Sequence, residues 1–300
     1  MKHFRDFSDF LADHFPGKMQ KLSVNAGFSC PNRDGTKGTG GCTYCNNLSF
    51  SPGYCRPALG VAQQLEEGKR FFARKYPHMR YLAYFQSYTS THTADISRLM
   101  DMYREACAVD GVDGVIIGTR PDCMPDALLE RLRELPWAMI EYGAESSHDS
   151  TLALINRCHT WAETADAVRR THEAGLPCGL HLINGLPGET EEMMLATVRA
   201  VNDLPVDVVK FHQLQLLRGT RMATDVEAGL YDIPRFTPES YATLCARLLR
   251  ALRPGIAIER FVSQSPPELL IYPRWGLKNY QFTNLVIKAL HSESLLSEKL

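Results

Sequence analysis

The sequence lacks a long apolar run and has almost no net charge. No hydrophobic stretch approaches the roughly 20 residues needed to cross a bilayer. Charged residues interrupt the apolar ones in residues 1–15, unlike the continuous apolar core of a signal peptide. The formal net charge is −1, so the chain has no overall attraction to nucleic acid or membranes. We therefore expect a cytoplasmic protein with no membrane association and no evident DNA binding.

Linkers, internal repeats and low-complexity segments are also missing from the sequence. No stretch is rich enough in proline, glycine or serine to demand a second independent domain. A protein of 300 residues buries roughly 75% of the surface that its unfolded chain exposes, so a substantial core is available. We expect one large domain or two small ones.

Short apolar runs alternate with amphipathic stretches of helical period along the first 220 residues. This order predicts an α/β fold with a mainly parallel sheet, because each helical crossover must return over the sheet. The predicted strands are residues 21–25, 80–86, 113–118, 137–143, 177–183 and 206–213. The predicted helices between them are residues 60–76, 94–109, 125–135, 161–175 and 189–204.

Polar or glycine-rich sequence follows the C-terminal end of nearly every predicted strand. An open, doubly wound sheet concentrates its chemistry at one switch point, whereas a barrel places all of these ends on one face. The pattern therefore favours a barrel or a partial barrel. After residue 220 the alternation changes, and we expect helices in residues 221–230, 238–252 and 277–290 and a further strand in residues 255–262.

Nine cysteines are present, and in a reducing compartment they are thiols or metal ligands rather than disulfides. Cys30, Cys42 and Cys45 lie in a connection of over thirty residues, rich in glycines and turn formers. Loops beyond about 12–15 residues are usually functional or disordered, and a bound metal centre would organise this one. Three thiolates leave one iron of a [4Fe–4S] cluster open, since most such clusters use four. The alternative is a structural zinc site whose fourth ligand is Cys55 or a histidine.

Several motifs together resemble the radical S-adenosylmethionine (SAM) superfamily, in particular its YhcC-type branch. The motifs are "CPNRDGTKGTGGCTYCN", "YFQSYTST", "GTRPDC", "INRCH" and "HLINGLPGE", which occur in order at successive strand ends. The branch is related to the elongator catalytic subunit and the oxygen-independent coproporphyrinogen oxidases. The resemblance implies a partial (β/α)6 TIM-like barrel with a C-terminal α/β extension. We expect an N-terminal segment at 1–16, the core barrel at 17–220 with a cluster loop at 26–58, and at 221–300 an extension covering the barrel mouth.

The resemblance also implies a chemistry. Cys30, Cys42 and Cys45 would hold a [4Fe–4S] cluster whose open iron chelates the amino and carboxylate groups of SAM. One electron from an external flavodoxin- or ferredoxin-type reductant would cleave SAM into methionine and a 5′-deoxyadenosyl radical, which abstracts a substrate hydrogen atom. A non-catalytic, metal-stabilised binding or regulatory protein is the alternative.

Individual roles follow from the matching positions in the family. Those implied to contact SAM are Tyr44 near adenine, Gln86 and Ser87 at the second strand end, Thr119 at the third, Glu145 at a ribose hydroxyl, Arg157 at the carboxylate, His181 near the ribose, and Gly185, Leu186 and Pro187, which frame adenine through backbone groups. For His181, a hydrogen-bonded core histidine is an equally good account. Arg120 is either a carboxylate clamp or the ion-pair partner of Asp122. Relatives usually have glycine where Cys158 stands, which leaves the backbone conformation there open.

The substrate side is less defined by the sequence. Lys210 and His212 on the last barrel strand are candidates to face the substrate, and residues 263–282 are expected to form part of its wall. Cys123 could exchange a hydrogen atom with a substrate radical or be a buried structural thiol. The substrate is a small molecule or an RNA, as in tRNA modification or tetrapyrrole chemistry. Cationic clamps for an acidic substrate could come from Arg218, Arg221, Arg260, Arg274 and Lys278.

Overall fold

A computed structural model describes residues 3–49, 51–73, 79–93 and 95–297 of the chain. Its centre is a seven-stranded sheet in which every neighbouring pair is parallel. The strands, in spatial order, are β1 (Met19–Val24), β2 (Arg80–Phe85), β3 (Val112–Thr119), β4 (Ala138–Glu145), β5 (Cys178–Asn184), β6 (Val208–Gln213) and β8 (Ala257–Arg260).

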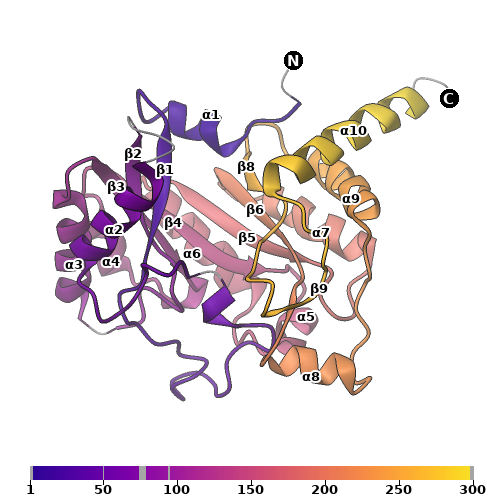
Figure 1. The fold of residues 1–300 in the computed structure, drawn as a ribbon, viewed down its shortest axis with the longest axis horizontal. Coiled ribbons are helices and arrows are strands. Elements are labelled where there is room, and N and C mark those ends of the chain that lie inside the picture. The colour runs from indigo at the N-terminus through magenta and orange to yellow at the C-terminus, as the bar shows by residue number, and fades with distance from the viewer. Residues whose placement is uncertain (1–2, 50, 74–78, 94, 298–300) are drawn as a thin grey trace.

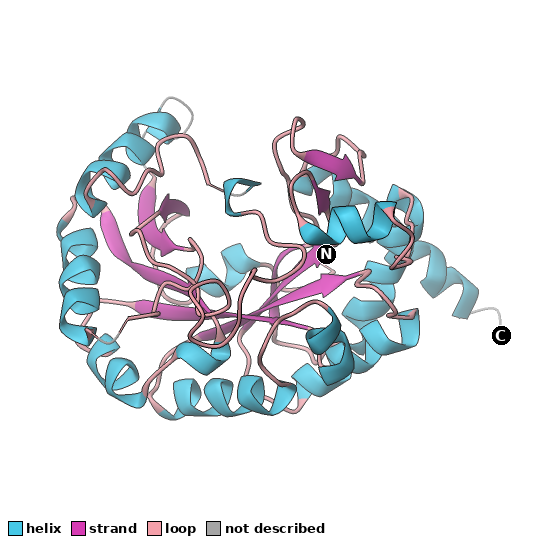
Figure 2. Ribbon diagram, turned by 90° about the horizontal axis from the view of Figure 1, so that it is seen from below, coloured by secondary structure: helices cyan, strands magenta, loops and turns pink. Residues whose placement is uncertain are grey.

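The helices cover the convex side of this curled sheet, and loops cross its concave side (Figure 2). Five of the helices connect consecutive strands of the core: α2 (Val61–Ala73), α3 (Ile96–Ala108), α4 (Asp126–Leu132), α6 (Trp161–Glu173) and α7 (Glu191–Asn202). Side-chain N-caps start three of them, at Asp95, Thr160 and Thr190. All five lie within the segments that the periodicity of the sequence predicts as helical.

The strand order decides between the two α/β architectures that the sequence left open. Strands β1 to β6 lie side by side in chain order, so the sheet contains no point at which the winding direction reverses. The sheet curls into an open half-barrel (Figure 2). The prediction of a partial TIM-like barrel is confirmed, and the six predicted core strands overlap the observed ones.

The C-terminal part continues the same sheet. The strand predicted in residues 255–262 is β8, which pairs with β6 at the sheet edge. The chain closes with α9 (Pro238–Ala251) and α10 (Asn279–Ser297), which pack together (Figure 1). Nearer the barrel mouth are α8 (Arg221–Glu227) and the antiparallel pair β7 (Leu216–Leu217) and β9 (Leu270–Tyr272). A division of the chain at residues 16 and 220 stays a prediction.

Side chains on the concave face form layers, because alternate residues of a strand point to the same side. The first layer is apolar and lies toward the N-terminal ends of the strands. Helix α1 (Phe7–Ala12) packs against it with two buried residues, Phe10 and Leu11. This layer includes Leu82, Ile116, Met139 and Val208. Two positions further along three of these strands the residues are Tyr84, Glu141 and Lys210, which line a cavity. The barrel is therefore packed at its base and polar above it.

No helix in the described ranges is long and apolar enough to pass through a bilayer.

Candidate functional site

A central cavity opens at the C-terminal ends of the parallel strands, where active sites of barrel folds lie. It has an empty volume of about 1310 Å³, including the part that opens to solvent. Nine of the predicted site residues line it: Cys30, Cys42, Cys45, Tyr44, Gln86, Thr119, Glu145, Arg157 and His181. The five that do not line it are Ser87, Cys123, Gly185, Leu186 and Pro187. Three sulfur atoms and a set of polar groups thus converge on one space.

The cysteine loop crosses the concave side of the sheet and is held there by the turn after α5 (Asp149–Leu154). The Asn156 side chain donates to the Gly41 carbonyl over 2.8 Å, and the Thr43 amide donates to the Ile155 carbonyl over 3.0 Å. Gly41 has a φ of +78°, and a Cβ added there would lie 2.8 Å from Arg33 Nε. This close approach requires glycine, as the run of glycines before Cys42 predicts.

Hydrogen-bond donors surround the sulfur atoms. Cys42 Sγ accepts from Arg157 Nη1 over 3.5 Å and from Asn32 Nδ2 over 3.6 Å. Cys30 Sγ accepts from Thr89 Oγ1 over 3.5 Å. Donors of this kind stabilise negative charge on sulfur, which lowers the cost of a thiolate in a buried site.

Burial raises the pKa of the Cys45 thiol to about 11, and the neighbouring Cys42 raises it further while Arg33 opposes the rise. The metal-free thiol is therefore protonated at neutral pH. Metal ligation requires the thiolate, so binding a metal centre displaces this proton. The guanidinium of Arg33 lies beside the residue and donates to the Cys45 carbonyl over 3.2 Å.

The two fourth ligands that the zinc alternative allows lie in different places: Cys55 is outside the central cavity, whereas the histidines His181 and His212 line it. Cys55 donates to the Ser23 carbonyl over 2.8 Å and does not line the central cavity. Burial raises the pKa of its thiol to about 12. Among the described residues, no three His, Cys, Asp or Glu side chains lie close enough to share one ion. The three separated sulfurs suit a larger centre, such as an iron–sulfur cube, better than one tetrahedral ion.

Arg157 and Glu145 are held in position by unusual backbone. Glu145 has a φ of +67°, at an irregularity in the pairing of β4 with β5. Arg157 Nη2 donates to the Gly143 carbonyl over 2.6 Å and lies 3.5 Å from Glu145 Oε1. A Cβ at Gly143 would lie 2.6 Å from the same carboxylate oxygen, so any side chain there would displace the carboxylate. Arg157 Nε is buried and has no partner among the described residues. An anion at this point would complete its hydrogen bonding.

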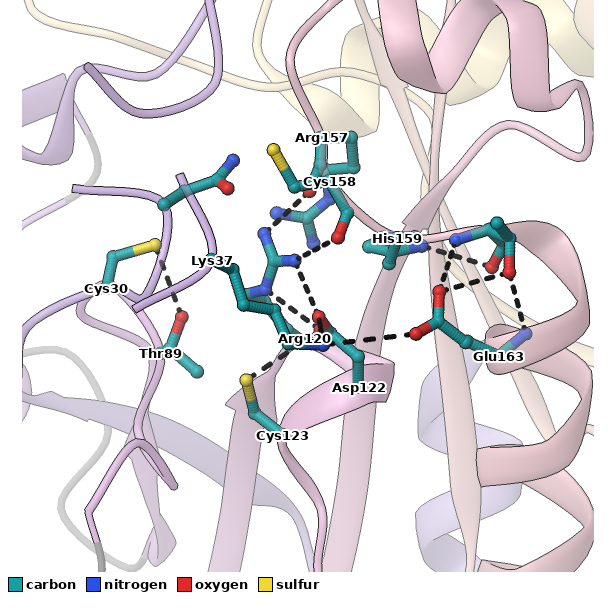
Figure 3. Close-up of polar contacts among 12 residues, drawn as sticks. Cys30, Lys37, Thr89, Arg120, Asp122, Cys123, Arg157, Cys158, His159 and Glu163 are labelled. Carbon is teal, nitrogen blue, oxygen red and sulfur yellow. Dashed lines mark hydrogen bonds and ion pairs between the residues drawn. The ribbon is translucent and has the colours of Figure 1, made fainter. Parts of the chain in front are cut away.

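Arg120 is the partner of Asp122, which resolves the two roles that the sequence left open (Figure 3). Its guanidinium makes two parallel bonds to the carboxylate, of 2.9 and 2.8 Å. It also donates to the carbonyls of Arg157 and Cys158, over 2.7 and 3.2 Å. Lys37 of the cysteine loop pairs with Asp122 over 2.6 Å. Arg120 is thus a buried structural cation that links β3, the turn after α5 and the loop.

Cys158 has a φ of +55°. This left-handed conformation favours glycine, which is the residue that the resemblance leads one to expect at this position. The adjacent Asn156 has a φ of +54°, a value that asparagine tolerates better than most residues. The turn therefore keeps its glycine-like backbone although a cysteine occupies it.

The remaining predicted residues have other surroundings. Gln86 donates to Ser23 Oγ over 2.7 Å, and Ser87 Oγ is buried with no partner among the described residues. Leu186, in the turn predicted to frame adenine, is fully buried in an apolar cluster with neighbours such as Ile183. Cys123 lines a second cavity, beside Lys37 and His92, and burial followed by the charge of Asp122 raises its pKa to about 12. Their predicted roles stay predictions.

A charged network that sequence reasoning missed lies in the middle of the barrel. Glu141 of β4 pairs with Lys21 of β1, with Lys210 of β6 over 3.2 Å and with His181 of β5 over 2.8 Å. Glu259 of β8 pairs with both lysines, over 2.6 and 3.0 Å. Burial alone would raise the pKa of Glu141, but Lys21 and Lys210 hold it well below its usual value. A single glutamate in the apolar strand "WAMIEYG" is the signal that could have identified it.

Both residues predicted to face the substrate, Lys210 and His212, line the central cavity. Of the five cationic candidates near the C-terminus, Arg260 lines the cavity, and Arg218, Arg221, Arg274 and Lys278 do not. From the segment predicted as a substrate wall, Ser263, Gln264 and Ser265 reach the cavity.

Comparison with family models and with curated proteins shows the family of this chain. A model of the radical SAM superfamily matches residues 32–201, and a model of the radical SAM C-terminal domain matches residues 206–292. The chain is 33% identical to protein YtqA of Bacillus subtilis over 294 residues, which are 97% of this chain and 90% of YtqA. It is 37% identical to protein YhcC of Escherichia coli over 275 residues, which are 90% of this chain and 86% of YhcC.

Among solved structures, an N-terminally truncated Elp3 of the archaeon Methanocaldococcus infernus superposes with a TM-score of 0.68. The match covers 93% of this chain and 64% of the longer Elp3 chain, at 16% sequence identity. At this identity the likeness shows a shared fold.

Proposed function

The chain belongs to the radical SAM superfamily, and we propose that it is an enzyme that holds a [4Fe–4S] cluster through Cys30, Cys42 and Cys45. With one electron from an external flavodoxin- or ferredoxin-type reductant, the cluster and SAM would supply methionine and a 5′-deoxyadenosyl radical that takes a hydrogen atom from the substrate. The substrate is a small molecule or an RNA.

One observation carries this proposal. Three cysteine sulfurs, and no fourth one among the described residues, line a cavity at the C-terminal ends of a half-barrel. Most iron–sulfur centres that only transfer electrons are saturated by four cysteines. A site with three protein sulfurs leaves room for an outside ligand, and polar side chains such as Glu145 and Arg157 line the same cavity.

The residues around the sulfurs suit the polar groups of SAM. Arg157 is placed to pair with the carboxylate, because its guanidinium lies against Cys42 and its buried Nε lacks a partner among the described residues. Glu145 is placed to accept from a ribose hydroxyl, since an ionised carboxylate accepts but does not donate. Tyr44, which lines the same cavity, offers an aromatic face for adenine.

Other residues keep the site dry and positioned. The apolar layer below the cavity, which includes Leu82 and Met139, closes the barrel on its N-terminal side. Excluding water protects a reactive radical from side reactions. The ion pair of Arg120 with Asp122 holds the turn that carries Arg157.

Anaerobic reconstitution with iron and sulfide tests the proposal. We expect a brown protein that forms 5′-deoxyadenosine from SAM when dithionite supplies the electron. Serine substitution of Cys30, Cys42 or Cys45 should abolish the colour and the product, whereas Cys55→Ser should retain both because Cys55 lies outside the cavity. Bound zinc without iron, in a protein that stays folded and forms no product, would instead support the non-catalytic class.

A further inference from the structure

Among the described residues, three of the cationic side chains that line the central cavity have a carboxylate partner, whereas Arg33 and Arg260 have none. The described residues that line this cavity include five cationic side chains: Arg33, Arg120, Arg157, Lys210 and Arg260. Arg33 and Arg157 lie against the cysteines, and Arg157 also faces Glu145. Arg120 pairs with Asp122, and Lys210 pairs with Glu141 and Glu259. Within the described part of the chain, the guanidinium of Arg260 has no carboxylate within 4.0 Å.

The network beside Arg260 cannot supply the missing anion. Lys21 and Lys210 each carry one positive charge, and Glu141 and Glu259 each carry one negative charge, so the four groups balance. Both carboxylates are engaged by both lysines. Arg260 therefore adds an uncompensated positive charge to this half of the cavity.

The contacts of Arg260 are neutral ones. Its Nη2 donates to His212 Nδ1 over 3.2 Å and to Ser263 Oγ over 3.3 Å. Burial, and then the charge of Arg260, hold the pKa of His212 well below its usual value, so this imidazole is uncharged at neutral pH. Arg260 Nη1 makes no hydrogen bond to the described residues, and unlike Nε it is not enclosed by protein. It faces the cavity.

The backbone that carries this group is braced from the neighbouring strand. The side-chain amide of Gln213 makes two bonds to the backbone of Ser263, accepting over 2.7 Å and donating over 3.0 Å. Gln215 donates to the Ser263 carbonyl as well, over 3.2 Å. The Ser263 hydroxyl bonds to His212 Nδ1 and accepts from Arg260, so this backbone fixes the direction of the guanidinium. A fixed guanidinium reduces the entropy that a ligand must otherwise remove.

We propose that the Arg260 guanidinium binds an anionic group of the substrate, a carboxylate or a phosphate. A guanidinium in a partly enclosed cavity binds most strongly to an anion that accepts hydrogen bonds from two of its N–H groups. The inference rests on the proposed function in one respect, namely that the ligand of this half of the cavity is the substrate.

The carboxylate of SAM is assigned elsewhere by the topology. Arg157 lies against Cys42, next to the place where a cofactor chelated by the cysteine-bound centre must sit. Arg260 ends β8, the sheet edge opposite β1, and its polar neighbours are His212 and Ser263. One anion therefore belongs beside the cysteines and a second beside Arg260.

The test is a titration of anaerobically reconstituted protein with two probes, acetate and inorganic phosphate. The thermal unfolding midpoint is followed against anion concentration at constant ionic strength, with and without SAM, and gives an apparent affinity. Arg260→Gln removes the charge, and Arg260→Lys keeps it without the planar fork. Arg218→Gln is the matched control, because Arg218 is an exposed arginine outside the cavity.

We expect Arg260→Gln to weaken anion binding about tenfold or more, Arg260→Lys to weaken it less, and Arg218→Gln to leave it unchanged. The probe that binds more tightly identifies the anionic group. The proposal is overturned if the wild type binds neither anion, or if SAM abolishes the binding. It is also overturned if Arg260→Gln binds as tightly as the wild type, or if Arg218→Gln loses as much affinity as Arg260→Gln. Formation of 5′-deoxyadenosine is measured separately, so a failure of the proposed function is seen without reference to anion binding.

Discussion

The buried pair of Arg120 and Asp122 gives a prediction whose size follows from the structure. Asp122→Asn keeps the shape of the side chain and removes its charge. Both side chains of the pair are 2% exposed, and Lys37, the third member, is 36% exposed. Burial alone would raise the pKa of Asp122, but Arg120 and Lys37 lower it from 3.8 to about 2.

This pKa shift corresponds to about 2.5 kcal/mol of folding free energy at about 1.36 kcal/mol per unit. Removing one partner of a buried ion pair costs about 3–5 kcal/mol in other proteins. We therefore expect Asp122→Asn to lower the free energy of unfolding by about 2–3 kcal/mol. Because folding lowers the pKa of this carboxyl group, its ionised form stabilises the folded protein. This stabilisation is complete above pH about 4 and is lost as the pH falls toward about 2.

Urea denaturation of the metal-free protein measures this difference. The control is Asp126→Asn, because Asp126 is 74% exposed and pairs with Arg170 at the surface, where such pairs contribute less than about 1 kcal/mol. The difference between wild type and Asp122→Asn should stay constant from pH 7 to about 4. A loss no larger than that of the control, or one that shrinks between pH 7 and 5, would refute the reasoning.

Two further predictions concern the turn after α5. Cys158 has a φ of +55°, which a β-branched residue adopts only at a cost. In urea denaturation, Cys158→Val should therefore lose about 2 kcal/mol of stability and Cys158→Gly little. Equal losses in the two variants would show that the backbone conformation is not the cause. Burial, and then the charge of Arg157, lower the pKa of His159 to about 3, so the unfolded chain binds a proton below pH about 6.5 that the folded protein does not. Stability should therefore fall by up to about 1.4 kcal/mol per unit as the pH drops from about 6.5 toward 3. His159→Gln should flatten this dependence, and the same change at the exposed His172 should not.

The sequence predicts the barrel well because its signals are local. Each core strand is a compact apolar run, and each long helix has a clear period, so the six core strands and five connecting helices lie where they are expected. The elements it misses are short. α1 has six residues and β7 has two, too few to show a period.

The interior charges are harder to predict because their partners come from distant strands. Glu141 meets Lys21 and Lys210, which are 120 and 69 residues away in the chain. Their meeting depends on the curl of the sheet, which the sequence does not encode in any one segment. The turn at Leu186 has a fully buried side chain, and its predicted backbone contact with adenine stays a prediction. Orientation at the end of a strand is a tertiary property.

The length of the cysteine loop has a structural reason beyond metal binding. From β1 to β4 the loop crosses three strand spacings, about 14 Å, and the eleven residues between Cys30 and Cys42 could span about two and a half times that distance. The excess folds back on itself, since the amides of Lys37 and Gly38 both donate to the Pro31 carbonyl, over 2.9 and 3.1 Å.

This fold-back brings Lys37 to Asp122, while Asn32 reaches the carbonyl of Asn156. The loop is thus anchored at two points, to Asp122 after β3 and to Asn156 in the turn after α5. A shorter loop could still carry three cysteines, but it would lose the anchor at Asp122 and with it the fixed direction of the sulfurs. The spacing between Cys30 and Cys42 therefore reflects the distance to these anchors as well as the size of the centre that we propose the cysteines hold.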